Sequence, residues 1–236
     1  MAKGNLYLIP TPLGETGFES GMPEFNLQIL QRIDTFIVEE LRTARRFLRK
    51  AGYMKDFETV TFYLLNEHTP DSEALAMLEK AMAGQHTGLL SEAGLPCIAD
   101  PGNIIVRLAH RKGIRVIPLT GPSSIMLALM ASGFNGQNFV FHGYLPVKPL
   151  EREKSLHDLE HAVVKGKQTQ IFIETPYRNL AMLESIVKIC HPSLMLCIAA
   201  DLTLETEWIC SQPLSDWKKQ KPLLHKRPAV FLLGNA

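Results

Sequence analysis

The chain has 236 residues, of which 46% are hydrophobic and 21% charged, and this balance excludes an intrinsically disordered protein. Its 25 Lys and Arg residues and 24 Asp and Glu residues leave a formal net charge of +1. That near-neutrality excludes a protein that coats nucleic acid or membranes through bulk charge, so any polyanion has to meet a local basic patch.

The first half of the chain alternates β-rich runs with helical patterns, which is typical of a mostly parallel sheet. Helices are predicted over 72–83, with Asp71 or Ser72 as the N-cap, over 104–112, and from Leu41 onward. Strands are expected at 6–9, 35–38, 59–64, 87–90 and 115–119.

A Thr-Gly-Pro-Ser turn after Leu119 breaks the fifth strand, and we place the domain boundary there, giving lobes of residues 1–119 and 120–236. Because strands 195–200 and 205–210 follow each other without a helix, the second sheet is expected to be mixed. The sequence therefore predicts an α/β fold with two α/β lobes. The other elements expected in the second lobe are strands at 139–142, 170–174 and 229–233 and helices at 125–131, 150–164 and 179–189.

Several common site chemistries are excluded. The sequence contains no G-x-G-x-x-G, no P-loop and no G-x-S-x-G nucleophile elbow. His157 and His161 share a helix face, but an exposed polar face is favoured over a zinc site because no third ligand is evident, so no metal is expected. The four cysteines form no C-x-x-C pair and indicate buried, reduced thiols in a cytoplasmic protein without a membrane-spanning segment. They are Cys97, Cys190, Cys197 and Cys210.

Four loops rich in Gly, Pro and small polar residues follow predicted strands. Each alone could be a plain turn, but the strand ends of an open α/β sheet are where ligands bind, so together they indicate a binding cleft. The loops are 10–14, 91–102, 119–124 and 174–178.

Six motifs, in order along nearly the whole chain, carry a family resemblance. They are LYLIPTPLG at 6–14, EELRT at 39–43, SEAGLPCIADPG at 91–102, PLTGPS at 118–123, GYLP at 143–146 and ETPYR at 174–178. With them the sequence resembles the tetrapyrrole methylase superfamily of S-adenosyl-L-methionine-dependent methyltransferases. Within it, the sequence is most similar to the bacterial enzymes that methylate a ribose 2'-hydroxyl of 16S ribosomal RNA.

The chain departs from that subfamily at charged positions. Glu40 and Glu92 stand where the subfamily has Asp, and Leu41 and Leu95 where it has Thr. Residues 200–204 read ADLTL in place of Arg-Glu-Leu-Thr-Lys, and subfamily members usually continue for some tens of residues beyond this end. The resemblance therefore supports the cofactor more strongly than the RNA substrate.

The resemblance implies a homodimer of two-lobed chains, with S-adenosyl-L-methionine in the cleft between the lobes, held largely by backbone groups of the loops. It also implies ribosomal RNA or the small ribosomal subunit as the partner, and no membrane. Carried over by position, the cofactor-binding residues are Pro10, Leu13, Glu92, Gly94, Pro96, Ser123, Ser124, Leu202 and Thr203.

Two carboxylates beside an arginine are the catalytic candidates. A ribose hydroxyl is a poor nucleophile and benefits from a carboxylate that accepts its proton. Glu39 and Glu40, next to Arg42, follow the second strand and could serve. The alternative is that they are first-turn carboxylates that interact with a helix dipole.

A run of basic residues follows on the same predicted helix. Arg42, Arg45, Arg46 and Arg49 share one face, Lys50 is adjacent, and no acid interrupts 41–50, as an RNA-binding face requires. A solvated face is the alternative. The residues assigned to substrate binding are Arg45, Arg46, Arg49, Glu174, Tyr177 and Arg178.

A second basic cluster lies at 218–227, directly after Trp217. It could add a stacking platform for RNA, although a solvated linker is favoured. Two other functions remain open for the whole chain. One is methylation of a tetrapyrrole or another small molecule, and the other is cofactor binding without catalysis.

Overall fold

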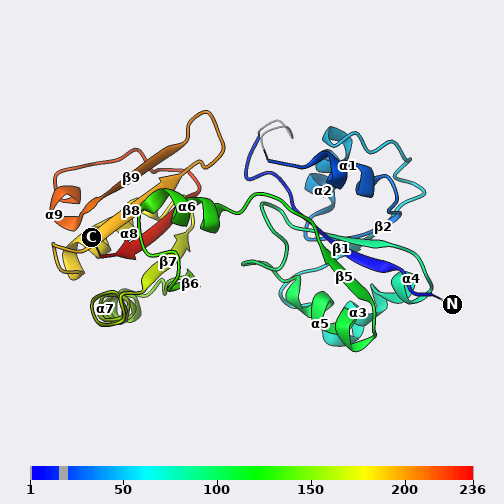
Figure 1. The fold of residues 1–236 in the computed structure, drawn as a ribbon, viewed down its shortest axis with the longest axis horizontal. Helices are drawn as coiled ribbons and strands as arrows, with labels where there is room; N and C mark the ends of the chain where they lie inside the picture. The colour runs from blue at the N-terminus through cyan, green and yellow to red at the C-terminus, as the bar shows by residue number, and fades with distance from the viewer. Residues whose placement is uncertain (1, 16–20, 236) are drawn as a thin grey trace. The chain divides into compact units, whose positions relative to one another are not determined.

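A computed structural model describes residues 2–15 and 21–235. The chain divides into two compact units, Met1–Ser123 and Ser124–Ala236, and each contains one five-stranded sheet (Figure 1). We call them the first and the second unit. The expected boundary at Leu119 precedes this division by one short turn.

The sheet of the first unit is entirely parallel, as the alternating pattern predicted. Its strand order is β3-β2-β4-β1-β5, so β4 lies between β2 and β1 although it follows β3 in the chain. The strands are β1 (Asn5–Ile9), β2 (Thr35–Val38), β3 (Thr61–Leu64), β4 (Thr87–Leu90) and β5 (Arg115–Pro118).

Helices cover both faces of this sheet, because neighbouring residues of each buried strand point in opposite directions. Ile9 and Leu90 pack with α1 (Glu24–Leu30) and α2 (Leu41–Lys50), whereas Leu6 and Leu89 belong to the core on the opposite face. Figure 1 shows α1 and α2 on one side of the first sheet and the other three helices on the other. Those three are α3 (Asp71–Ala76), α4 (Glu79–Met82) and α5 (Asn103–Arg111).

The predicted helix over 72–83 is wrong as one element. It is interrupted between α3 and α4, where the Leu78 N–H donates to the Leu75 carbonyl, a tighter turn that the apolar spacing does not reveal. The predicted N-cap is also wrong. Pro70 holds that position without a side-chain bond, and Asp71 pairs with Arg107 instead.

Two smaller differences concern the neighbouring elements. β3 begins at Thr61, two residues after the predicted start, because Thr59 bonds back to the Asp56 carbonyl in a turn. Helix α1, whose seven residues begin directly after Pro23, is not among the helices predicted from the sequence. Short helices of this length depend on packing, and here Ile29 and Leu30 are buried in the core.

The sheet of the second unit is mixed, as expected, with strand order β6-β7-β10-β8-β9. Only β6 and β7 pair in parallel, and the remaining neighbours are antiparallel. The strands are β6 (Phe139–Tyr144), β7 (Thr169–Glu174), β8 (Met195–Ala200), β9 (Trp208–Pro213) and β10 (Ala229–Gly234).

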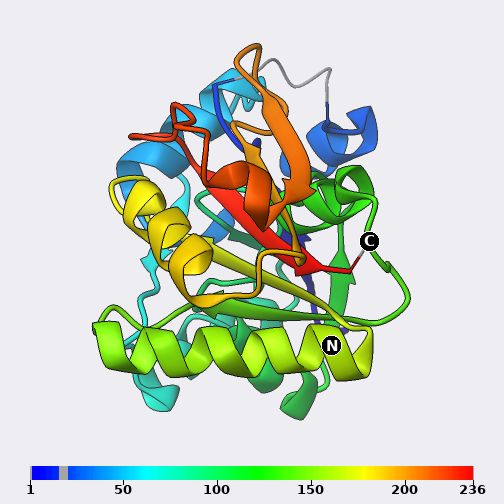
Figure 2. The same cartoon turned by 90° about the vertical axis from the view of Figure 1, so that its left-hand side faces the viewer.

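Three helices pack on one face of this sheet, and Phe172 and Phe231 lie at the centre of the shared core. The three helices are α7 (Pro149–Gly166), α8 (Asn179–Ile189) and α9 (Leu214–Trp217), and α7 is the long yellow-green helix of Figure 2. Helix α6 (Ser124–Ser132) packs on the opposite face, where the Ser211 hydroxyl donates to the Ser132 carbonyl at 2.9 Å.

The strand predicted at 205–210 is wrong in position, since β9 begins at Trp208. The residues before it form a turn in which Glu207 accepts a hydrogen bond from the Thr203 N–H at 2.8 Å. The stacking platform suggested around Trp217 is also wrong. That side chain is 2% exposed and donates to the Leu196 carbonyl inside the core.

All four cysteines are free thiols, two buried and two half-buried. Burial raises the pKa of Cys97, Cys190 and Cys197 to about 12, so these thiols stay protonated at neutral pH. Across residues 2–15 and 21–235, no helix is both long and apolar enough to cross a membrane. The same residues contain no cluster of three His, Cys, Asp or Glu side chains that could hold a metal ion.

Candidate functional site

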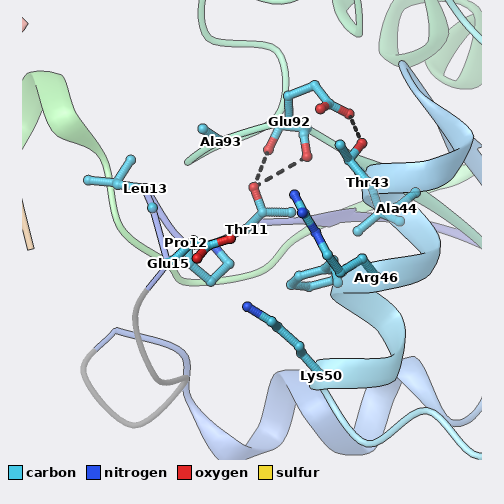
Figure 3. Close-up of a pocket in the computed structure, with 14 residues that line it drawn as sticks. Thr11, Pro12, Leu13, Glu15, Thr43, Ala44, Arg46, Lys50, Glu92 and Ala93 are labelled. Atoms are coloured by element: carbon cyan, nitrogen blue, oxygen red, sulfur yellow. Dashed lines mark hydrogen bonds between the residues drawn. The ribbon is translucent and has the colours of Figure 1, made fainter. Parts of the chain in front are cut away.

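The strand order of the first unit creates a crevice between the loops that follow β1 and β4. β1 leads to α1 on one face of the sheet, whereas its neighbour β4 leads to α5 on the other. Loops that leave neighbouring parallel strands in opposite directions open a crevice at their carboxyl ends, the usual ligand site of such sheets. A pocket lies there, between the loop after β1, the start of the loop after β4, and α2 (Figure 3).

The loops after β1 and β4 are joined directly by backbone hydrogen bonds. The Thr11 N–H donates to the Gly94 carbonyl at 2.9 Å, and the Gly94 N–H donates to the Thr11 carbonyl at 3.0 Å. Side chains reinforce this bridge, because the Ser91 hydroxyl donates to the Gly94 carbonyl at 2.7 Å. One wall of the pocket is therefore held by main-chain bonds that do not depend on most of the loop side chains.

The loop after β5 packs against the same pair of loops. A Cβ atom at Gly121 would lie 2.2 Å from Cβ of Pro10, so only glycine permits this approach. The Asn26 side chain donates to the Thr120 carbonyl at 2.7 Å and fixes the loop from α1. Three of the four predicted loops thus come together in the first unit, and the fourth lies in the second unit.

The long loop after β4 has a strained but well-supported backbone. Cys97 and Ala99 have φ values of 68° and 63°, unusual for residues other than glycine. The Asp100 carboxylate accepts hydrogen bonds of 2.8 Å from the Cys97 and Gly102 N–H groups. Burial raises the pKa of Asp100. Strain held by such bonds is typical of binding loops, because it presents backbone groups in a fixed arrangement.

The two catalytic candidates have opposite environments. Glu40 is the N-cap of α2 and accepts hydrogen bonds from the Arg42 N–H at 2.9 Å and the Thr43 N–H at 2.7 Å, which lower its pKa. Glu39 lines a second pocket on the α5 side of the loop. Burial, and then the nearby Asp100 carboxylate, raise the pKa of Glu39. Glu40 therefore has a structural role in the helix, whereas Glu39 has the more basic carboxylate.

The basic residues of α2 fall into two sets. Arg45 and Arg49 turn toward Phe57, with the Arg49 guanidinium carbon 3.9 Å from the ring centroid. Arg46 and Lys50 line the pocket described above, on the side of the helix that faces the loop after β1 (Figure 3). The sequence spacing placed the arginines on one face and did not distinguish these two environments.

Thr43 is a pocket residue that the sequence analysis did not assign. Its hydroxyl donates to the Glu92 carboxylate at 2.7 Å and so connects α2 to the loop after β4. Leu13, a predicted cofactor residue, lines the same pocket. A Cβ atom added at Gly94, whose φ is 77°, would lie 3.1 Å from the Leu13 side chain. Thr43 is the last residue of the EELRT motif at 39–43, so the motif could have identified it as a site residue.

Apart from Ser124, which begins α6, the predicted site residues of the second unit lie at or after the ends of β7 and β8, at one edge of its sheet. Ala229 pairs with Glu174 at the end of β7 and with Ala200 at the end of β8, so the segments that follow both strands begin at the same level. Glu174 is 4% exposed and accepts hydrogen bonds from Arg178 at 2.6 and 2.9 Å. Tyr177, 70% exposed, meets the ring of His225 edge-on.

The segment after β8 is fixed by a second ion pair. Asp201 accepts hydrogen bonds from Arg227 at 2.7 Å and from the Thr206 hydroxyl at 2.8 Å. Asp201 and Thr203 have φ values of 51° and 72°, and Leu202 between them is buried. Arg227, which was grouped with a basic cluster, therefore stabilises the segment that carries the predicted cofactor residues Leu202 and Thr203.

Comparisons with known proteins agree with this description. No protein-family model matches the chain. Over 98% of its length it is 32% identical to ribosomal RNA small subunit methyltransferase I of Escherichia coli O157:H7, and it covers 78% of that protein. It is 31% identical to the protein of the same name from Vibrio cholerae serotype O1, over 89% of this chain and 69% of that one.

Solved structures agree in fold. The methyltransferase CobJ superposes with a TM-score of 0.66 at 20% identity, covering 99% of this chain and 95% of that one. The cobalt precorrin-4 methyltransferase CbiF gives a TM-score of 0.61 at 15% identity, over 98% of this chain and 94% of that one. These matches confirm the predicted tetrapyrrole methylase fold. The chain belongs to the ribosomal RNA small subunit methyltransferase I family.

Proposed function

We propose that this methyltransferase transfers a methyl group from S-adenosylmethionine to a ribose 2'-hydroxyl of 16S ribosomal RNA. Membership of the family makes it a methyltransferase, and the donor and the target atom are our proposal. The observation that supports an RNA substrate best is the position of α2. Two of its basic residues, Arg46 and Lys50, line the pocket at the carboxyl ends of β1 and β4, where a ligand of this sheet is expected.

The loops of both units suit the proposed cofactor. Most of the loop after β4 lies outside helices and strands. Apart from groups that are bonded within the protein, such as the Gly94 carbonyl and the Cys97 and Gly102 N–H groups, its backbone can offer N–H and C=O groups to a polar ligand. Gly94 and Gly121 allow the backbones of three loops to approach closely. When bound, S-adenosylmethionine supplies an activated methyl group. The proposed cofactor contacts are Pro10, Leu13, Glu92, Gly94, Pro96, Ser123 and Ser124, with Leu202 and Thr203 from the second unit.

The protein's own contribution is alignment and proton removal. Holding the hydroxyl in line with the methyl group accounts for much of the rate enhancement in such displacements. Glu39 is the better of the two carboxylates to accept the hydroxyl proton, because its raised pKa makes it the stronger base. Glu40 orients α2 through its cap, and Arg42 carries a positive charge beside it.

The remaining features of the proposal rest on the family resemblance of the sequence motifs. We propose that the enzyme is a homodimer, acts in the cytoplasm on the small ribosomal subunit, and uses the exposed Tyr177 beside the paired Glu174 and Arg178 as a further substrate contact. On the first unit, we assign Arg46 of α2 to substrate binding, whereas Arg45 and Arg49 hold the helix against Phe57.

Binding and transfer can be tested separately. Calorimetry should show micromolar or tighter binding of S-adenosylmethionine and of its demethylated product. Incubation with methyl-tritiated S-adenosylmethionine and small ribosomal subunits from a strain lacking the gene should then label 16S ribosomal RNA. Labelling of a tetrapyrrole in place of RNA would favour small-molecule methylation, and binding without transfer to either would favour a non-catalytic protein.

A further inference from the structure

The basic residues of α2 differ in the partners they have. The Arg49 guanidinium lies over Phe57 and donates to the Tyr53 and Lys55 carbonyls at 2.8 and 3.0 Å. Arg45 lies between Phe57 and Phe62, 5.5 and 5.3 Å from their ring centroids. Both side chains are thus engaged in holding α2 against the segment that leads to β3.

Arg46 and Lys50 are available to a ligand. They are one turn apart on α2, and both side chains extend toward the loop of residues 11–15 (Figure 3). Within the part of the chain that the structure describes, neither has a hydrogen-bond or ion-pair partner. Two cations that converge on a pocket without a protein counter-ion indicate an anionic ligand.

The carboxylates of the pocket do not neutralise this pair. Glu92 is hydrogen-bonded to Thr43, one helical turn before Arg46, and Glu15 is exposed at the rim. The pocket therefore has a carboxylate end at Glu92 and a cationic end at Lys50 (Figure 3). A phosphodiester group of an RNA strand, which carries a negative charge, matches the cationic end.

We infer that this pocket binds a phosphodiester group of the RNA substrate through Arg46 and Lys50, and that these two residues, rather than Arg45 and Arg49, form the phosphate contact of α2. The inference rests on the proposed function and adds to it a defined binding site on the first unit. Lys50 thereby becomes a substrate-binding residue, and Arg45 and Arg49 become residues that position the helix.

The test compares two double variants that lose the same charge. Arg46→Ala with Lys50→Ala removes the proposed contact, and Lys80→Ala with Arg111→Ala removes two exposed cations from helices α4 and α5 on the opposite face of the sheet. The substrate is the small ribosomal subunit from a strain lacking the gene. The pocket variant should raise KM for the subunit by about tenfold for each lost contact. It should also reduce the slope of log affinity against log salt by about 1.4, about 0.7 per contact on a single strand.

Several outcomes would overturn the inference. A pocket variant with the wild-type KM and salt slope would do so, as would an equal change in the Lys80 and Arg111 control. If the pocket variant lost affinity for S-adenosylmethionine in calorimetry while KM for the subunit stayed unchanged, the cations would be holding the cofactor's carboxylate instead. Substitution by Arg46→Lys with Lys50→Arg should restore most of the affinity. A wild-type protein that methylates no RNA would refute the proposed function itself, a result distinct from an active enzyme with an unaffected pocket variant.

Discussion

The sheet edges of the two units are held together in different ways. In the first unit the loops are joined by backbone bonds such as the Thr11–Gly94 bridge, and the two pocket cations beside them have no partner among the described residues. In the second unit the charged residues pair with each other, Glu174 with Arg178 and Asp201 with Arg227. Charge therefore stabilises the edge of the second unit, whereas in the first unit we propose that the two cations bind a ligand.

The largest effect is expected from breaking an ion pair of the second unit. Arg178→Met leaves the Glu174 side chain, 1% exposed, without its counter-ion and should lower the free energy of unfolding by about 3 kcal/mol. The exposed pair of Lys148 and Glu151 on α7 provides the control, and Lys148→Met should cost less than about 1 kcal/mol. Urea denaturation measures both. Equal losses would mean that the Glu174 pair stabilises no more than an exposed one.

The loop packing of the first unit should be nearly as sensitive to an added methyl group. Gly121→Ala places a Cβ 2.2 Å from Pro10 and should cost about 2 kcal/mol, because the loops have to move apart. At Gly136, where an added Cβ would meet no atom of another segment within 4 Å, the same change should cost less than about 0.5 kcal/mol. Thermal unfolding measures both variants. If Gly121→Ala and Gly136→Ala lower the melting temperature equally, the three loops are not closely packed.

A smaller effect distinguishes the basic residues within α2. Arg49→Ala removes the contact with Phe57 and two hydrogen bonds to carbonyls, and should lower stability by about 1 kcal/mol. Arg46→Ala should change stability by less than about 0.5 kcal/mol, because it removes an exposed side chain without a partner among the described residues. The reverse order in urea denaturation would contradict the division of the helix into two sets.

The smallest expected effects are the opposite pH dependences of stability that Glu39 and Glu40 produce. The pKa of Glu39 is raised above its ordinary value of 4.5, so ionisation weakens the fold, and this carboxyl contributes less stability as pH rises through that range. The pKa of Glu40 is lowered, so its contribution is present above 4.5 and is lost as pH falls through its folded-state value. Glu39→Gln should therefore be at least as stable as wild type at pH 7, and Glu40→Gln less stable. Denaturation curves between pH 4 and 7 with the same sign for both variants would refute this difference.

Much of the fold could be predicted because buried strands have a strong signal. The predicted apolar runs at 35–38 and 195–200 match β2 and β8 in both bounds. The position predicted for the strand at 205–210 is wrong because Asp201, Thr206 and Glu207 form hydrogen bonds in a turn. The spacing of apolar residues does not reveal such bonds.

The site was predictable in its loops but not in its contacts. Parallel strands end at one edge, so the gathering of loops 10–14, 91–102 and 119–124 follows from the strand pattern. The difference between Arg45 and Arg46 depends on where Phe57 packs, which is a tertiary contact between segments that spacing along one helix does not show.

We propose above that this protein methylates a ribose of 16S ribosomal RNA. Mass-spectrometric mapping of ribosomal RNA from a strain lacking the gene tests it most directly. We expect one ribose 2'-O-methyl group to be missing from the 16S ribosomal RNA of that strain. The wild-type gene should restore it, and the Arg46 and Lys50 double variant should restore it poorly. An unchanged set of ribose methylations in that strain would contradict the account.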